Sequence, residues 1–216
     1  RWSKLPEAYR ERVKPTCEQY GIFSRNKRHG GNELDISAMI TYTVADKWLR
    51  LGGRLAFVIT GTLFKNPSSE GFRQFALVPS DPQTPYLRPI SVDDLKALKP
   101  FPDASNHTTV AVFDKAAEPG TYPIPYREWD SIQGFSKAIP PDLSLPDVMQ
   151  RVSITEKEAA PVSGNGSPWA VLTPGRFSLL GKLSGTCDWA EGHKGITTDL
   201  NGVYFVPILQ VGDGVV

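Results

Sequence analysis

The fold class is decided by the segment ELDISAMITYTVADKWLRLGGRLAFVIT, residues 33–60. Its first part places apolar residues near helical spacing behind Asn32, a good N-cap, and Gly52-Gly53 supplies the C-terminal stop. The run RLAFVIT, residues 54–60, is apolar on both faces, which is typical of a central strand in a parallel sheet. A helix, a glycine pair and a buried strand together predict an α/β fold.

The flanking segments predict further elements of the same kind. TTVAVFD, residues 108–114, predicts a second buried strand, and residues 122–129 predict an edge strand because Pro123 and Pro125 cannot donate to a neighbour. A helix is expected over residues 5–19, with Pro15 ending it. Further helices are expected over residues 69–77 and 147–157, and short strands over 169–172, 196–198 and 203–209.

Composition excludes several classes of protein. Of 216 residues, 40% are hydrophobic and 22% are charged, as in ordinary globular proteins. Cys17 and Cys187 lie far apart without a CxxC pair, so neither a zinc site nor a disulfide framework is expected, and a reducing cytoplasm is the default. No apolar run approaches the roughly 18 residues of a membrane span.

Common catalytic motifs are missing from the sequence. The histidines at 29, 107 and 193 lack metal-ligand spacing, and His107 is interpreted as an ordinary loop residue. No GxSxG, GxGxxG or GxxxxGK[ST] occurs. Asp93-Asp94 is interpreted as a pair of solvated charges. The residues alone therefore indicate an α/β sheet without a recognisable catalytic centre.

Two segments are candidates for ligand contact. Phe101 lies between Pro100 and Pro102, just before the strand at 108–114, so its ring is either held ready to stack on a planar ligand or buried in the core. A loop carries Arg25, Lys27, Arg28 and His29, within residues 1–31, which hold eight Lys or Arg against three Glu. These side chains either contact phosphate or form a solvated surface.

Several segments, in order, resemble the catalytic domains of restriction–modification-type DNA adenine-N6 methyltransferases. The first is the segment at residues 33–60. The others are TLFKNPSSEGFRQFAL (62–77), KPFPDASNHTTVAVFDKA (99–116), GTYPIPYREW (120–129), SPWAVL (167–172) and KGITTDLNGVYFVPIL (194–209). These enzymes bind S-adenosylmethionine through a glycine-rich turn and act through an Asn/Asp/Ser-Pro-Pro-aromatic tetrapeptide, and neither motif occurs here. Residues 1–6 are similar to the chain just after that tetrapeptide.

The resemblance implies the second half of a doubly wound, Rossmann-like methyltransferase sheet in residues 1–135 and a connector into a recognition domain in residues 136–216. It also implies that Phe101 packs against a target adenine extruded from DNA, and that Arg25, Lys27, Arg28 and His29 contact DNA phosphate. The N-terminal half of the same protein would then hold S-adenosylmethionine, and this chain alone would bind no cofactor and transfer no methyl group.

Two other classes of function stay open from the sequence. One is a non-catalytic nucleic-acid-binding α/β module, and the other is an unrelated α/β domain that acts in protein assembly. The coding sequence before Arg1 distinguishes them from the methyltransferase. A glycine-rich strand-turn followed by Asn-Pro-Pro-aromatic favours the methyltransferase, whereas an initiator Met directly before Arg1 favours the binding module.

Overall fold

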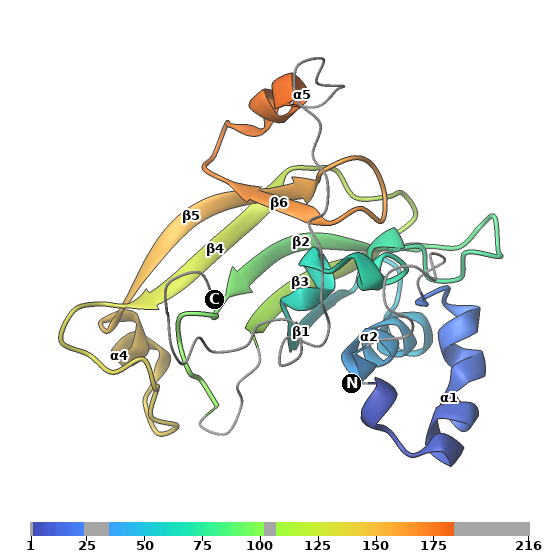
Figure 1. Ribbon diagram of the computed structural model, residues 1–216, viewed down its shortest axis with the longest axis horizontal. Helices are drawn as coiled ribbons and strands as arrows, with labels where there is room; N and C mark the ends of the chain where they lie inside the picture. Colours follow the sequence, from blue (N-terminus) through green and yellow to red (C-terminus); the bar gives the residue numbers. More distant parts are fainter. Residues whose placement is uncertain (1, 24–34, 102–106, 184–216) are drawn as a thin grey trace, which may run out of the picture. The chain divides into compact units, whose positions relative to one another are not determined.

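The computed structural model describes residues 2–23, 35–101 and 107–183. The chain divides into two compact units, residues 1–181 and 182–216, and almost all of the second lies outside the described residues. The first unit is a mixed α/β structure in which helices accompany a six-stranded sheet (Figure 1). The expected α/β class is therefore confirmed, while the strands expected at 196–198 and 203–209 lie outside the described residues.

The longer helices lie in the N-terminal part of the chain. They are α1 (Glu7–Gln19) and α2 (Ile36–Lys47), followed along the chain by the short helices α3 (Thr62–Lys65), α4 (Leu145–Met149) and α5 (Leu180–Leu183). Short 3-10 turns are formed by Trp2–Lys4, Pro67–Ser69, Phe72–Gln74 and Phe177–Leu179.

The helix expected over residues 5–19 is confirmed as α1, which ends at Gln19, but the roles expected of Pro15 and Asn32 at the helix ends are not those of the structure. The expectation that Pro15 ends α1 is wrong, because the helix runs on to Gln19 and stops where Gly21 adopts a positive φ of 60°. The N-cap of α2 is Asp35, whose carboxylate accepts a 2.9 Å hydrogen bond from the Ser37 backbone N–H. Asn32, the predicted cap, lies outside the described residues.

The sheet has the strand order β1-β3-β2-β4-β5-β6. Its strands are β1 (Arg54–Thr60), β2 (Tyr86–Asp94), β3 (Thr108–Ala116), β4 (Ile124–Ser131), β5 (Val152–Pro161) and β6 (Trp169–Leu172). β2 and β4 pair in parallel, and the other four neighbouring pairs are antiparallel. The sheet is therefore mixed, and the strand predicted at 169–172 is confirmed.

The expectation that residues 54–60 form a central parallel strand is wrong for the described sheet. β1 lies at its end and pairs antiparallel with β3 from Arg54 to Thr60. Ile59 is buried in the core, while Val58, on the other face, is 48% exposed. An apolar run reports which side chains avoid water, but the position of the strand depends on partners that the run does not contain.

The edge strand expected at 122–129 is also wrong, because β4 lies inside the sheet between β2 and β5. Pro125 is tolerated because the pairing with β2 begins only at the following residue, Tyr126, opposite Val92.

Two predicted helices are also wrong. The helix expected over 147–157 ends at Met149, and β5 starts at Val152. The helix expected over 69–77 is replaced by two 3-10 turns, and Phe75 adopts a left-handed φ of 55° that interrupts any helix.

An aromatic cluster contributed by helices, turns and strands forms much of the core of the unit. The hydroxyl of Tyr42 in α2 donates a 2.7 Å hydrogen bond to the backbone oxygen of buried Phe72. The rings in mutual contact are those of Tyr20, Tyr42, Phe64, Phe72, Phe75, Phe113, Tyr122 and Trp169. Aromatic burial on this scale supplies much of the apolar stabilisation of the unit.

The buried Arg73 links α3 and the residue after it to the loop between β5 and β6. The Arg73 guanidinium donates to the backbone oxygens of Leu63 and Asn66 at 2.7 Å and to those of Gly166 and Ser167 at 3.0 and 2.9 Å. Burial lowers the pKa of Arg73 to about 10, so the group stays charged at neutral pH. The predicted domain boundary at residue 135 falls inside this first unit, between the paired strands β4 and β5.

We expect Arg73→Met to lower the free energy of unfolding by about 3–5 kcal/mol, because four carbonyl oxygens, two of them in buried hydrogen bonds, lose their donor. Urea denaturation followed by circular dichroism measures the change. Arg50→Met is the matched control, because Arg50 is exposed. Equal unfolding free energies for the two variants would contradict the bridging role of Arg73.

Candidate functional site

The carboxyl ends of β1 and β2 lie beside the amino end of β3. β1 and β2 both pair antiparallel with β3, so they run in the same direction and their carboxyl ends meet at the start of β3. The Gly61 N–H donates to the His107 backbone oxygen at 2.8 Å, and the Leu95 N–H donates to that of Thr108 at 3.0 Å. In α/β sheets, ligands bind preferentially beyond the carboxyl ends of parallel strands.

A pocket of about 220 Å³ lies at this edge beside β1. Val58, Ile59 and Thr60 of β1 form one part of its lining, and the start of α2 contributes Asp35 and Ser37. Phe101, His107 and Thr108 complete the lining. The pocket is smaller than the roughly 300–1,000 Å³ of typical drug-sized ligand sites, so its size favours a single planar ring system.

The Phe101 ring is 48% exposed and lines this pocket. The alternative prediction, that Phe101 fills the core, is therefore wrong. The ring has apolar and polar neighbours within the same pocket, as a site for an amphipathic planar ligand requires.

A buried carboxylate organises the polar side of the site. The Asp94 side chain is 5% exposed, and its Oδ1 lies 2.6 Å from Nε2 of His107 and accepts a 2.9 Å hydrogen bond from the Lys96 backbone N–H. Its Oδ2 accepts a short hydrogen bond from the Tyr126 hydroxyl, and Lys65 Nζ lies 3.9 Å away. The interpretation of Asp94 as a solvated charge is therefore wrong.

The hydrogen bonds decide the protonation state of Asp94. Burial raises its pKa, but the bonds from His107, Tyr126 and the Lys96 amide outweigh burial and hold the pKa below its ordinary value. Burial, together with the hydrogen bond to Asp94 and its charge, raises the pKa of Tyr126. At neutral pH the pair therefore consists of an ionised Asp94 and a neutral tyrosine that donates to it.

The His107 imidazole is fixed on two sides. Asp94 binds its Nε2, and the ring lies over Gly61, where an added Cβ would meet Nε2, Cε1 and Cδ2 at 2.7, 2.8 and 2.9 Å. Contact with three ring atoms at nearly equal distances shows that the ring faces the glycine. Gly61 has a φ of −62°, so close approach of the imidazole, rather than backbone conformation, requires a glycine here.

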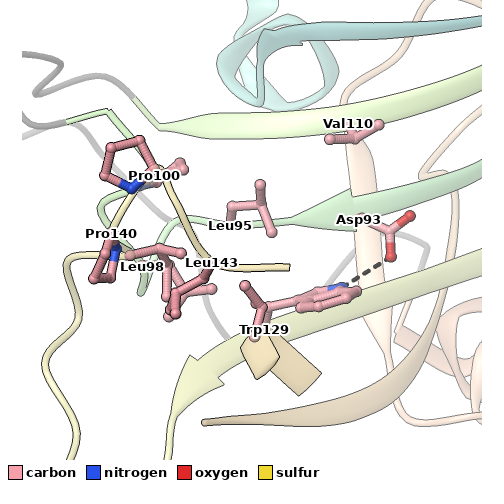
Figure 2. Close-up of a pocket in the computed structure, with 11 residues that line it drawn as sticks. Asp93, Leu95, Leu98, Pro100, Val110, Trp129, Pro140 and Leu143 are labelled. Atoms are coloured by element: carbon pink, nitrogen blue, oxygen red, sulfur yellow. Dashed lines mark hydrogen bonds between the residues drawn. The ribbon is translucent and has the colours of Figure 1, made fainter. Parts of the chain in front are cut away.

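A second pocket, of about 410 Å³, is lined by Pro100, the residue before Phe101, and is mainly apolar. Figure 2 shows Leu98, Pro100 and Pro140 grouped at one side of this pocket and the indole of Trp129 at another, with its Nε1 directed at Asp93. That hydrogen bond is 2.8 Å long. The Asp93 carboxylate is also bound by both Nε and Nη2 of Arg127 at 2.7 Å, so its charge is already paired.

The proline-rich segment after β4 braces the Phe101 segment. Lys99 forms a parallel bridge with Ala138, and its N–H donates to the Lys137 backbone oxygen at 2.8 Å. Ile139, Pro140 and Pro141 then line the apolar pocket together with Pro100. The segment expected to be a connector thus fixes the chain immediately before Phe101.

Sequence patterns singled out Phe101, which lines the pocket, but not His107, Asp94 or Tyr126. A signal was present, because Asp94 follows Val92 at strand spacing and so lies on an apolar face. Arg25, Lys27, Arg28 and His29 lie outside the described residues. Within the described part of the chain, no group of three His, Cys, Asp or Glu side chains forms a metal site. No helix there is long and apolar enough to cross a membrane.

Comparison with known proteins gives no match to a protein-family model and none to a curated protein. The likeness of individual segments to adenine methyltransferases therefore remains a prediction.

We expect Asp94→Asn to lower the free energy of unfolding by about 1–3 kcal/mol at neutral pH, because buried donors lose a charged acceptor. The folded-state pKa of Asp94 is depressed, so its contribution is present above the ordinary value of 3.8 and is lost as the pH falls through the lower folded value. The stability difference between the variant and the unmodified chain should therefore shrink as the pH falls below 3.8.

Urea denaturation at a series of pH values from about 7 to about 3 measures this difference. Asp142→Asn is the control, because Asp142 is exposed. A difference that stays constant across the series would show that Asp94 contributes no ionisation-linked stability.

Proposed function

We propose that this chain is the second half of the catalytic domain of an S-adenosylmethionine-dependent DNA adenine-N6 methyltransferase, inactive alone and completed by an N-terminal half. The observation that carries the proposal is the Phe101 ring, which is 48% exposed and lines a pocket of about 220 Å³ at the carboxyl end of β1. A partly exposed phenyl ring beside polar groups is suited to stacking on a nucleobase.

The strand arrangement supports the larger architecture of the proposal. β1 and β2 point the same way with β3 reversed between them, so the described sheet is mixed, and mixed sheets occur among doubly wound folds. The residues of β1 that face away from the core include Ala56 and Val58, which are exposed. Two exposed apolar residues and an unpaired edge within the described sheet fit a strand on which further sheet is built.

The chemistry requires a base that has left the duplex. An adenine within a stacked pair cannot present its amino group to a methyl donor, so the base is flipped at a cost of about a few kcal/mol. In the proposal, stacking on Phe101 offsets part of this cost. The sequence lacks the glycine-rich turn that would hold S-adenosylmethionine, so the proposal assigns cofactor binding to the N-terminal half and the described residues to the base.

The full product of the gene that encodes this chain is the material for the direct test. Transfer of a labelled methyl group from S-adenosylmethionine to adenine in duplex DNA supports the proposal. A full product that binds DNA but transfers no methyl group would instead support a non-catalytic nucleic-acid-binding module.

We expect Phe101→Ala to weaken the binding of single-stranded DNA with an unpaired adenine by about 1–3 kcal/mol, because the base loses its stacking partner. In the full gene product the same change should lower methyl transfer while the fold is retained. Phe135→Ala is the matched control, since its ring is 44% exposed and lies outside this pocket. Unchanged affinity and turnover in Phe101→Ala would remove Phe101 from the site.

Arg25, Lys27, Arg28 and His29 are proposed to contact DNA phosphate. Replacing all four by alanine should make the dependence of log affinity on log salt concentration shallower, by about 0.9 for each phosphate of duplex DNA that the variant no longer neutralises. Fluorescence anisotropy at several salt concentrations measures the slope. An identical slope in the variant and the unmodified chain would exclude these residues from the interface.

A further inference from the structure

The orientation of His107 determines which chemical group it offers to a ligand. Asp94 is ionised at neutral pH, so the Nε2 atom that it binds carries a proton and donates it in a hydrogen bond. In the neutral imidazole the other nitrogen, Nδ1, then carries no proton and is an acceptor. A buried carboxylate that fixes one nitrogen in this way sets the tautomer of the whole ring.

The surroundings hold this orientation firmly. Asp94 cannot turn away easily, because the Tyr126 hydroxyl and the Lys96 N–H bind it from two further directions. Gly61 lies under the imidazole face, and the side chain of His107 is only 13% exposed. These contacts hold the ring in one orientation, and His107 lines the same pocket as Phe101.

We infer that His107 is a specificity-determining residue, whose Nδ1 accepts a hydrogen bond from the exocyclic amino group of a base stacked on Phe101. This inference rests on the proposed function, because it takes a nucleobase as the ligand of the pocket. An acceptor at this position favours adenine, which has an amino group at position 6, over hypoxanthine or guanine, which have an oxygen there. With hypoxanthine or guanine, a lone pair of Nδ1 would face a lone pair of the base oxygen, and no hydrogen bond would form.

The experiment compares two probes that differ mainly at this position. Thymidine oligonucleotides with a single central adenine or a single central hypoxanthine are titrated into the full chain, and NMR gives both dissociation constants. The unmodified chain should bind the adenine oligonucleotide about fivefold more tightly, which is the size of one neutral hydrogen bond. No preference, or no binding of either oligonucleotide, would overturn the inference.

Two variants separate reading of the base from stacking. His107→Phe keeps a flat ring without an acceptor, so the preference should fall to about onefold while the affinity for the hypoxanthine oligonucleotide is retained. Phe101→Ala should weaken both affinities and keep their ratio. A preference that persists in His107→Phe overturns the role of His107 alone, whereas unchanged affinities in Phe101→Ala count against the proposed function.

If His107→Phe does not fold, a second variant and a spectroscopic measurement still test the inference. Gly61→Ala keeps the imidazole but displaces it, because the new methyl group would lie within 2.7–2.9 Å of three ring atoms, and it should also abolish the preference. In the unmodified chain labelled with ¹⁵N-histidine, the adenine oligonucleotide should shift the Nδ1 resonance of His107 and the hypoxanthine oligonucleotide should not. Equal shifts with both would overturn the inference.

Discussion

The junction between β2 and β4 is the constraint on which the rest of the structure depends. The parallel pairing there covers only Val92 to Asp94 opposite Tyr126 to Glu128, yet it joins the β1-β3-β2 part of the sheet to β4-β5-β6. Side chains reinforce this short ladder from both faces of the sheet. Asp94 binds Tyr126 on the buried face, and Asp93 binds Arg127 and Trp129 on the other. Consecutive aspartates thus hold both sides of one narrow joint.

The same joint positions the candidate site. One carboxylate oxygen of Asp94 binds Tyr126 across the joint, and the other binds His107, just before β3. The position of the imidazole therefore depends on both parts of the sheet. Asp93 and Trp129 form one wall of the apolar pocket whose other residues support the chain before Phe101. Packing of the sheet and placement of the pocket at β1 are therefore consequences of the same contacts, as preorganised sites require.

Local pattern in the sequence predicted elements better than it predicted their partners. RLAFVIT and TTVAVFD are strands as expected, because a short apolar run of strand-forming residues can be recognised without knowing its neighbours in the sheet. The position of β1 at the end of the described sheet and of β4 inside it was not predictable, because strand order depends on residues far away in the chain. Phe101 was a candidate because two prolines flank it in the sequence, whereas the Asp94–His107–Tyr126 contacts span three separate segments and follow only from the fold.

The two ends of the described sheet differ in how they meet solvent. β6 has four residues and gives little room for another strand, whereas β1 has seven residues in a regular, apolar run. Its outward backbone N–H and C=O groups are a template for a strand from a second molecule. At high protein concentration the isolated chain should therefore self-associate through β1 rather than through β6, and a charged residue in place of Val58 would make a more soluble form for structural work.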